Sequence, residues 1–115
     1  MDDTFDNWTI QLRKGLLELC VLSAIGAGER YGYTLVRALV EAPGLEISEG
    51  SIYPLLSRMR KQGWVSTRLE ESPDGPARKY YRLSPSGQAR LAAMESYYDA
   101  LTGAVASLRL PTDSP

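Results

Sequence analysis

Apolar residues recur at helical spacing in four stretches of the chain and alternate with polar residues in two short ones. Residues 11–25 are apolar on most sides and are followed by two glycines, which predicts a helix buried on several faces. Residues 31–41 carry leucine and valine pairs four positions apart and precede a Pro-Gly stop, so a second helix is expected there. Trp8, ahead of the first helix, is interpreted as a packing anchor rather than a binding residue.

Residues 48–63 have the best specified helical pattern. Ser48 is placed to cap this helix, and Gly63 is placed to end it in a left-handed conformation. Pro54 lies beyond the first turn, so it removes one backbone hydrogen bond and is expected to kink the helix or shift its start. Apolar side chains spaced i, i+3, i+4 and i+7 form one stripe that should face the core, namely Ile52, Leu55, Leu56 and Met59.

Residues 64–69 and 78–83 alternate between apolar and polar positions, which is the pattern of β-strands with one buried face. The turn-forming run Ser72-Pro73-Asp74-Gly75-Pro76 separates them, so the two strands are expected to pair as a hairpin. Alternation also splits Tyr80 from Tyr81, and we expect one ring to pack under the hairpin while the other is exposed.

The last helix is expected to start at residue 85, where Pro85 takes the first helical position and Ser84 caps it. Its apolar residues follow one another at spacings of 3 and 4, which is a heptad seam: Leu91, Met94, Tyr98, Leu101, Val105 and Leu108. At 1.5 Å per residue the helix would be roughly 37 Å long, more than a domain of this size covers by itself. We therefore expect this seam to join two copies of the chain, with docking on its own domain as the alternative.

These elements predict a mainly α fold with a small β-hairpin. Residues 1–84 would form a winged helix-turn-helix domain, residues 85–110 a dimerisation helix and residues 111–115 a frayed tail. The length of 115 residues suits one small domain with a modest core.

Composition excludes several classes of function. The chain has no histidine and one cysteine, Cys20, so histidine-based triads are excluded and neither an ordinary zinc site nor an internal disulfide is expected. Cys20 is interpreted as a buried thiol. We find no catalytic constellation and expect neither an enzyme nor a bound cofactor. No apolar run approaches the roughly 18 residues of a membrane span, and the acidic N-terminus lacks the pattern of a secretory signal, so a cytoplasmic location is expected.

The net charge of −1 conceals an uneven distribution. Residues 48–90 contain eight cations and four anions, or +4, whereas the rest of the chain contains five cations and ten anions, or −5. A basic middle between acidic ends attracts a polyanion to one face of the molecule.

The candidate DNA-binding residues lie in this basic middle. On the third helix they are Ser51, Tyr53, Ser57, Arg58 and Lys61, whose hydroxyls and charges suit base edges and phosphates in a major groove. On the hairpin they are Arg78, Lys79 and Arg82, which alternation divides between two faces, so that not all of them can touch DNA. An ordinary solvated face remains the alternative for the helix. A dimeric module that binds an acidic protein or a small molecule, without DNA, remains the alternative for the whole chain.

Five segments together resemble the PadR family of bacterial transcriptional regulators: residues 11–15, 31–33, 48–56, 63–65 and 78–84. The resemblance covers residues 8–108, and its most specific parts are residues 50–56 and 78–84. It implies a winged helix-turn-helix, a two-fold homodimer joined through the C-terminal helix, and repression that an effector relieves. Dimerisation through the heptad seam would place two recognition helices about 34 Å apart, so a near-palindromic DNA site is expected. The single C-terminal helix is similar to that of the compact subfamily.

The resemblance also implies a candidate ligand site. In compact members of this family, flat aromatic compounds enter a pore at the dimer centre and stack on an aromatic residue of the last helix. Tyr97 stands at the matching position here, and Trp8 is a second candidate for the same pore. The alternative for Tyr97 is a plain role in the dimer interface.

Overall fold

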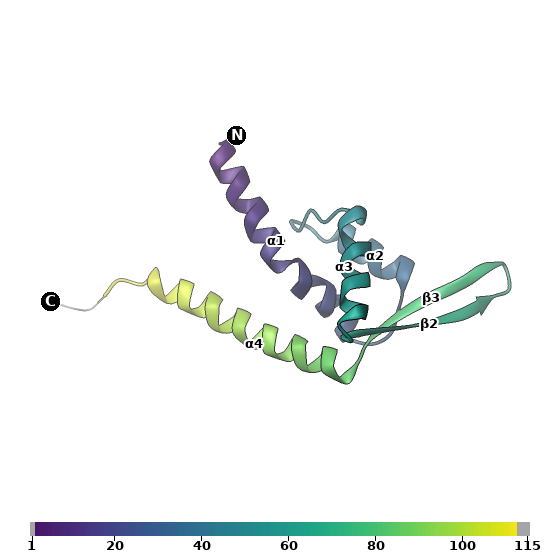
Figure 1. The fold of residues 1–115 in the computed structure, drawn as a ribbon. Helices are drawn as coiled ribbons and strands as arrows, with labels where there is room; N and C mark the ends of the chain where they lie inside the picture. Colours follow the sequence, from purple (N-terminus) through teal and green to yellow (C-terminus); the bar gives the residue numbers. More distant parts are fainter. Residues whose placement is uncertain (1, 113–115) are drawn as a thin grey trace.

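The computed structural model describes residues 2–112, which form four α-helices and one three-stranded antiparallel sheet (Figure 1). In chain order the elements are α1 (Asp3–Gly26), β1 (Arg30–Tyr31), α2 (Gly32–Glu41), α3 (Glu49–Lys61), β2 (Val65–Ser72), β3 (Gly75–Leu83) and α4 (Pro85–Leu108). The predicted mainly α fold with a hairpin and a long last helix is confirmed. None of the described helices is long and apolar enough to cross a membrane.

The hydrophobic core lies where α1, α2 and α3 meet at the base of the hairpin. The stripe predicted on the third helix is buried along its whole length, so this prediction is confirmed. Burying side chains of this size contributes about 1.5–3 kcal/mol each, which fixes the face that α3 turns inward. The other helices supply the C-terminal turns of α1 and the apolar face of α2, through Val21, Leu22, Ile25, Leu35, Val36 and Leu39.

Helix α1 begins eight residues earlier than predicted, because Asp2 caps it. The Asp2 carboxylate accepts a hydrogen bond from the backbone N–H of Thr4 at 3.0 Å. Trp8 therefore lies inside α1, is 57% exposed and touches Phe5, with ring centroids 5.9 Å apart. Trp8 belongs to the first half of α1, which extends beyond the core (Figure 1). Within a single chain it therefore does not anchor the packing, and that interpretation is wrong.

The two ends of α3 differ in how well the sequence predicted them. Ser48 occupies the N-cap position as predicted, but its hydroxyl shares a hydrogen bond with the hydroxyl of Ser51 at 2.7 Å and accepts none from a backbone N–H. Gly63 has φ of 82° and ends the helix as predicted, with the N–H of Trp64 bonded to the carbonyl of Met59 at 3.0 Å. Pro54 leaves the helix continuous from Glu49 to Lys61 and does not shift its start.

The hairpin is longer than predicted and belongs to a larger sheet. Strands β2 and β3 pair from Val65 opposite Leu83 to Ser72 opposite Gly75, with an irregularity between residues 70 and 72. Strand β1, which the sequence analysis missed, adds a third strand beside β3. Tyr81 is 7% exposed and packs into the core, whereas Tyr80 is half-buried on the opposite face, so the predicted division of the two rings is confirmed for Tyr81.

The end of α3 is tied to the beginning of α4. The Ser84 N–H donates to the carbonyl of Trp64 at 3.0 Å, and the hydroxyls of Ser84 and Ser86 donate to the carbonyl of Gly63. Ser84 also caps α4 as predicted, since its hydroxyl oxygen accepts the N–H of Gly87 at 3.1 Å. Gly87 lies so close to the Trp64 carbonyl that a Cβ atom there would overlap it.

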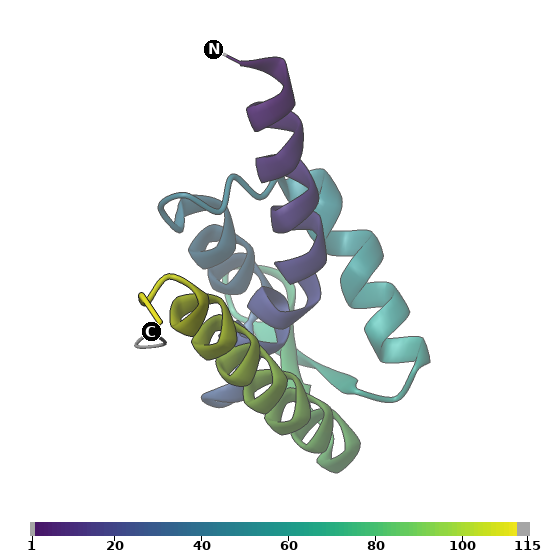
Figure 2. The same ribbon diagram turned by 90° about the vertical axis from the view of Figure 1, so that its left-hand side faces the viewer.

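Helix α4 lies on the core for its first turns only and then extends past it, on the side opposite the hairpin (Figures 1 and 2). Leu91, the first residue of the predicted seam, is 7% exposed and packs within its own domain. Its assignment to a dimer interface is therefore wrong, because the body of the same chain already covers it. Met94 is partly buried against the same core, and the seam residues beyond it are exposed, namely Tyr98, Leu101, Val105 and Leu108.

Two smaller predictions concern the C-terminal tail and Cys20. Residues 111–112 have no regular structure, and the rest of the predicted tail, residues 113–115, lies outside the described residues. Cys20 is free, as expected for a single cysteine, but it is half-buried rather than fully buried. Partial burial raises the pKa of its thiol above the ordinary value.

Candidate nucleic-acid interface

An open groove of about 560 Å³ separates the hairpin from the helices at its base. Helix α3 contributes Tyr53 to this groove, the start of α2 contributes Tyr33, and strand β3 contributes Arg78 and Lys79. Residues from the third helix and from the hairpin, which the sequence analysis selected separately, therefore line one concave surface.

The predicted residues of α3 are all exposed but do not all face the hairpin. Ser57 and Lys61 lie near the middle of the exposed face, opposite the buried stripe. Ser51 lines a smaller hollow with Arg13 and Lys14 of α1. Since seven residues make nearly two helical turns, Arg58 lies on the same side as Ser51. The third helix therefore presents one set of polar groups to the hairpin and another to α1.

Sequence analysis missed Arg60, which lies seven residues after Tyr53 and hence on the side of α3 that faces the hairpin. Burial raises the pKa of the nearby Tyr81 phenol, and the positive charge of Arg60 partly offsets that rise. Its spacing from Tyr53 was visible in the sequence, but the direction of the hairpin relative to α3 was not. Arg60 adds an exposed cation beside the groove.

The register of the sheet divides the hairpin cations between two faces, as predicted. Arg78 and Arg82 share a face with Tyr80, whereas Lys79 shares the opposite face with Tyr81. The Arg78 guanidinium lies 5.1 Å from the centre of the Tyr31 ring, and Arg82 Nε donates to the hydroxyl of Ser66 at 3.2 Å. All three predicted cations are exposed, so each retains donors that can face a phosphate.

Anionic side chains gather toward the tip of the hairpin, and Arg78 is the cation nearest to them, directly opposite Glu70. The exposed residues nearest the turn include the anions Glu70, Glu71 and Asp74. A fourth hairpin cation, Arg68, is paired with Glu29 at 2.6 Å and with Glu70 at 3.6 Å. An anionic partner would thus be attracted to the part of the hairpin that borders α3, since like charges repel it from the tip.

A short helix with an exposed polar face, beside a hairpin whose cations share its groove, is the arrangement of a winged helix-turn-helix. The sequence matches the model of the Transcriptional regulator PadR-like family over residues 21–93, which is more than half of the chain. The chain belongs to this family.

Other PadR-like proteins and further transcriptional regulators match nearly the whole chain. A transcriptional regulator of Streptococcus is 44% identical, with 87% of this chain and 98% of that chain covered and a TM-score of 0.75. A PadR-like transcriptional regulator from Bacillus cereus is 37% identical, with coverage of 89% and 99% and a TM-score of 0.77. A PadR family regulator from Eggerthella lenta is 31% identical, with coverage of 96% of each chain and a TM-score of 0.80.

A curated relative supports the same family. A transcriptional regulator of Mycobacterium tuberculosis is 30% identical over 81 residues, which are 70% of this chain and 74% of that protein. This PadR-like protein is a DNA-binding transcriptional regulator and not an enzyme, as the sequence analysis predicted.

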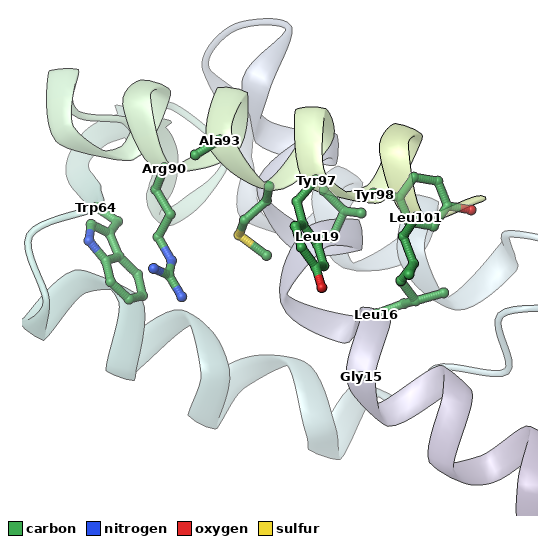
Figure 3. Close-up of a pocket in the computed structure, with 10 residues that line it drawn as sticks. Gly15, Leu16, Leu19, Trp64, Arg90, Ala93, Tyr97, Tyr98 and Leu101 are labelled. Atoms are coloured by element: carbon green, nitrogen blue, oxygen red, sulfur yellow. The ribbon is translucent and has the colours of Figure 1, made fainter. Parts of the chain in front are cut away.

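The PadR-like chain has a second hollow, of about 450 Å³, between α1 and α4 (Figure 3). Its walls are mostly apolar, and Tyr97 lines it although 71% of that residue is exposed. Trp8, the second candidate for a ligand pore, is not among its lining residues, whereas Trp64 is. The Arg90 guanidinium lies 3.8 Å from the centre of the Trp64 ring and donates to the Glu18 carboxylate at 2.6 Å. Trp64 thus joins this hollow to the end of α3.

Proposed function

We propose that this PadR-like protein is a repressor that binds a near-palindromic operator as a homodimer. The observation that carries the proposal is the groove that brings Tyr53 of α3 together with Arg78 and Lys79 of the hairpin. A helix of this kind fits the major groove, and a hairpin beside it can hold the adjacent phosphates. In this proposal α3 is the recognition helix and the β2–β3 hairpin is the wing.

The proposed contacts with DNA come from α3 and from the wing. Ser57 and Lys61 on the exposed face of α3, with Tyr53 and Arg60 beside the wing, are proposed to approach base edges and the nearer phosphates. Ser51 and Arg58 lie on the side of α3 that faces α1, and they are proposed to contact the other edge of the DNA major groove. On the wing, all three predicted cations are proposed to supply affinity that does not depend on base sequence. Arg78 and Lys79, which line the groove, would hold phosphates directly, and Arg82 would act by attraction at longer range.

The proposed dimer rests on the part of α4 that its own domain leaves uncovered. Apolar residues at heptad spacing continue there, and a second copy of the chain would cover them. Two-fold symmetry would then place two recognition helices about 34 Å apart, one turn of DNA, which is why a near-palindromic site is proposed. A protein that works on DNA belongs in the bacterial cytoplasm, as the sequence analysis expected.

The proposed effector site is the hollow between α1 and α4. Its apolar walls and the ring of Tyr97 suit a flat aromatic compound, and the single C-terminal helix supports assignment to the compact subfamily. The contact between Arg90 and Trp64 gives such a compound a physical route to the end of α3.

The function is tested by measuring affinity for the DNA upstream of the protein's own gene as a function of salt. Log K falls with log[salt] in proportion to the number of phosphates held, at about 0.9 per contact. Arg78→Ala and Lys79→Ala each remove one proposed contact from both subunits of the dimer, so each should reduce the slope by about 1.8. Arg109→Ala is the matched control, because it removes an exposed cation at the far end of α4 and should leave the slope unchanged.

Two results would count against the proposal. If the two wing variants keep the affinity and the slope of the unaltered protein, the wing does not hold phosphates. If the unaltered protein gives no complex even at low salt, the alternative of a binding module without DNA function is favoured.

A further inference from the structure

We propose that Glu29 and Arg68 are positioning residues that set the angle of the wing, and that Arg68 does not itself contact DNA. This inference rests on the proposed role of the wing in holding DNA. It gives Arg68, which was not among the predicted DNA contacts, a role different from that of the other wing cations.

The first observation is the geometry of the ion pair. Glu29 lies between α1 and β1, and Arg68 lies on β2, 39 residues later. Arg68 Nε donates to one carboxylate oxygen of Glu29 at 2.7 Å, and the Arg68 Nη2 group donates to the other at 2.6 Å. Two parallel hydrogen bonds between a planar guanidinium and a carboxylate fix orientation as well as distance. The pair therefore resists rotation of β2 relative to the turn after α1.

The second observation is a row of side chains that crosses the sheet. Tyr31 on β1, Tyr80 on β3 and Arg68 on β2 are directly opposite one another. The Tyr31 and Tyr80 ring centroids are 5.6 Å apart, and the Arg68 guanidinium lies 4.6 Å from the centre of the Tyr80 ring. Arg68 is thus stacked on one side and paired on the other, and its remaining contact is with Glu70 at 3.6 Å. Its donors are directed at carboxylates of the protein.

The third observation is where this row lies. Strand β1 is only two residues long, and its last pairing with β3 is that of Tyr31 with Tyr80. Beyond this row the wing consists of two strands alone, which project from the body (Figure 1). At about 3.3 Å per residue, the five residues from Arg68 to the turn span roughly 17 Å, so a rotation of about 10° at the row moves the tip by about 3 Å. The ion pair therefore lies where the two-stranded part of the wing leaves the three-stranded sheet, and a contact there sets the direction of the wing.

The test compares the DNA affinities of Glu29→Gln and Glu71→Gln. Each substitution removes one negative charge from the DNA-binding domain, which by electrostatics alone strengthens binding to DNA. Glu71 is an exposed wing residue, so Glu71→Gln should bind as tightly as the unaltered protein or more tightly. For Glu29→Gln we expect the opposite sign, an affinity that is lower by up to about fivefold, the upper end of what an exposed ion pair contributes. An affinity of Glu29→Gln equal to or above that of the unaltered protein would overturn the proposal.

Arg68→Gln separates positioning from contact. If Arg68 only positions the wing, this variant should lose affinity while the dependence of log K on log[salt] keeps its slope. A slope lower by about 1.8, which is one phosphate contact in each subunit of the dimer, would show that Arg68 holds a phosphate and would overturn the proposal. Lys79→Ala serves as the reference for a phosphate contact, and its failure to change the slope would count against the proposed function instead.

A measurement without DNA keeps the inference testable by itself. Amide hydrogen exchange of residues 69–79 should be faster in Glu29→Gln than in the unaltered protein and unchanged in Glu71→Gln, because only the first variant frees the base of the wing. Equal exchange in all three proteins would overturn the proposal. Circular dichroism of each variant establishes that the comparison is between folded proteins.

Discussion

Gly87→Ala should destabilise this protein although glycine is the poorer helix former. Gly87 lies in the first turn of α4, where exchange for alanine ordinarily stabilises a helix by up to about 1 kcal/mol. Here a Cβ atom would overlap the carbonyl oxygen of Trp64, which is a backbone group and cannot turn away as a side chain would. That carbonyl also accepts the N–H of Ser84 at 3.0 Å. Any shift that relieves the overlap therefore strains the link between α3 and α4.

The size of the effect follows from three terms. Overpacking of this kind costs about 1–3 kcal/mol, and loss of the hydrogen bond between Ser84 and Trp64 costs about 1 kcal/mol more. The better helix propensity of alanine returns at most about 1 kcal/mol. The net loss is about 2 kcal/mol, which for a chain of this length lowers the melting temperature by about 8 °C.

The assay is thermal unfolding followed by circular dichroism at one fixed protein concentration, since association would make the midpoint depend on concentration. Gly50→Ala is the matched control: Gly50 also lies in the first turn of a helix, but nothing is within 4 Å of the position of an added Cβ atom. We expect the control to be as stable as the unaltered protein or slightly more stable. If Gly87→Ala were also as stable, the close approach of α4 to Trp64 would be refuted.

Two further predictions concern the last helix and Glu29. Leu101→Asp should weaken self-association at least about tenfold, because it buries a charge in the proposed seam. Ser96→Asp, on the opposite face of α4, is the control and should leave self-association unchanged. The molecular mass is measured by light scattering after gel filtration, and equal masses for the two variants would contradict the proposed seam. The hydrogen bonds from Arg68 lower the pKa of Glu29, so its ion pair should stabilise the fold fully above pH 4.5, the ordinary value, and this contribution should be lost as the pH falls through the lowered pKa. The urea midpoints of the unaltered protein and Glu29→Gln should therefore converge in acid, and a constant difference would show that the ion pair contributes nothing.

Local patterns predicted most of the fold. The stripe from Ile52 to Met59 specifies which face of α3 is inward, because four apolar side chains at helical spacing have one way to leave water together. Gly63 marks the end of α3, since glycine adopts a left-handed backbone at little cost. Alternation along residues 78–83 predicted both the strand and the division of its cations between two faces. Each of these features depends on neighbours along the chain.

The features that were missed depend on contacts between distant parts of the chain. Strand β1 is too short to show a period and exists because β3 passes beside it. Leu91 continues the heptad spacing, but packing next to Gly26 places it in its own core. Ser48 has the right residue type for a cap, yet the hydroxyl of Ser51 takes its hydrogen bond. The role of Arg60 likewise depends on the direction in which the wing leaves the body.

The hydrogen bonds that join residues 63 and 64 to the first turn of α4 connect the wing to the last helix. The wing and the outer part of α4 leave this point on opposite sides, and only Ser84 separates β3 from α4 (Figure 1). With 24 residues, α4 is about 36 Å long, so a swing of roughly 5° moves its far end by about 3 Å. A wing that turned with α4 would move its tip, nine residues or roughly 30 Å away, by about 2.6 Å in the opposite sense. A dimer that holds the far ends of two such helices would therefore set the spacing of its two wings to within about one base-pair step of 3.4 Å.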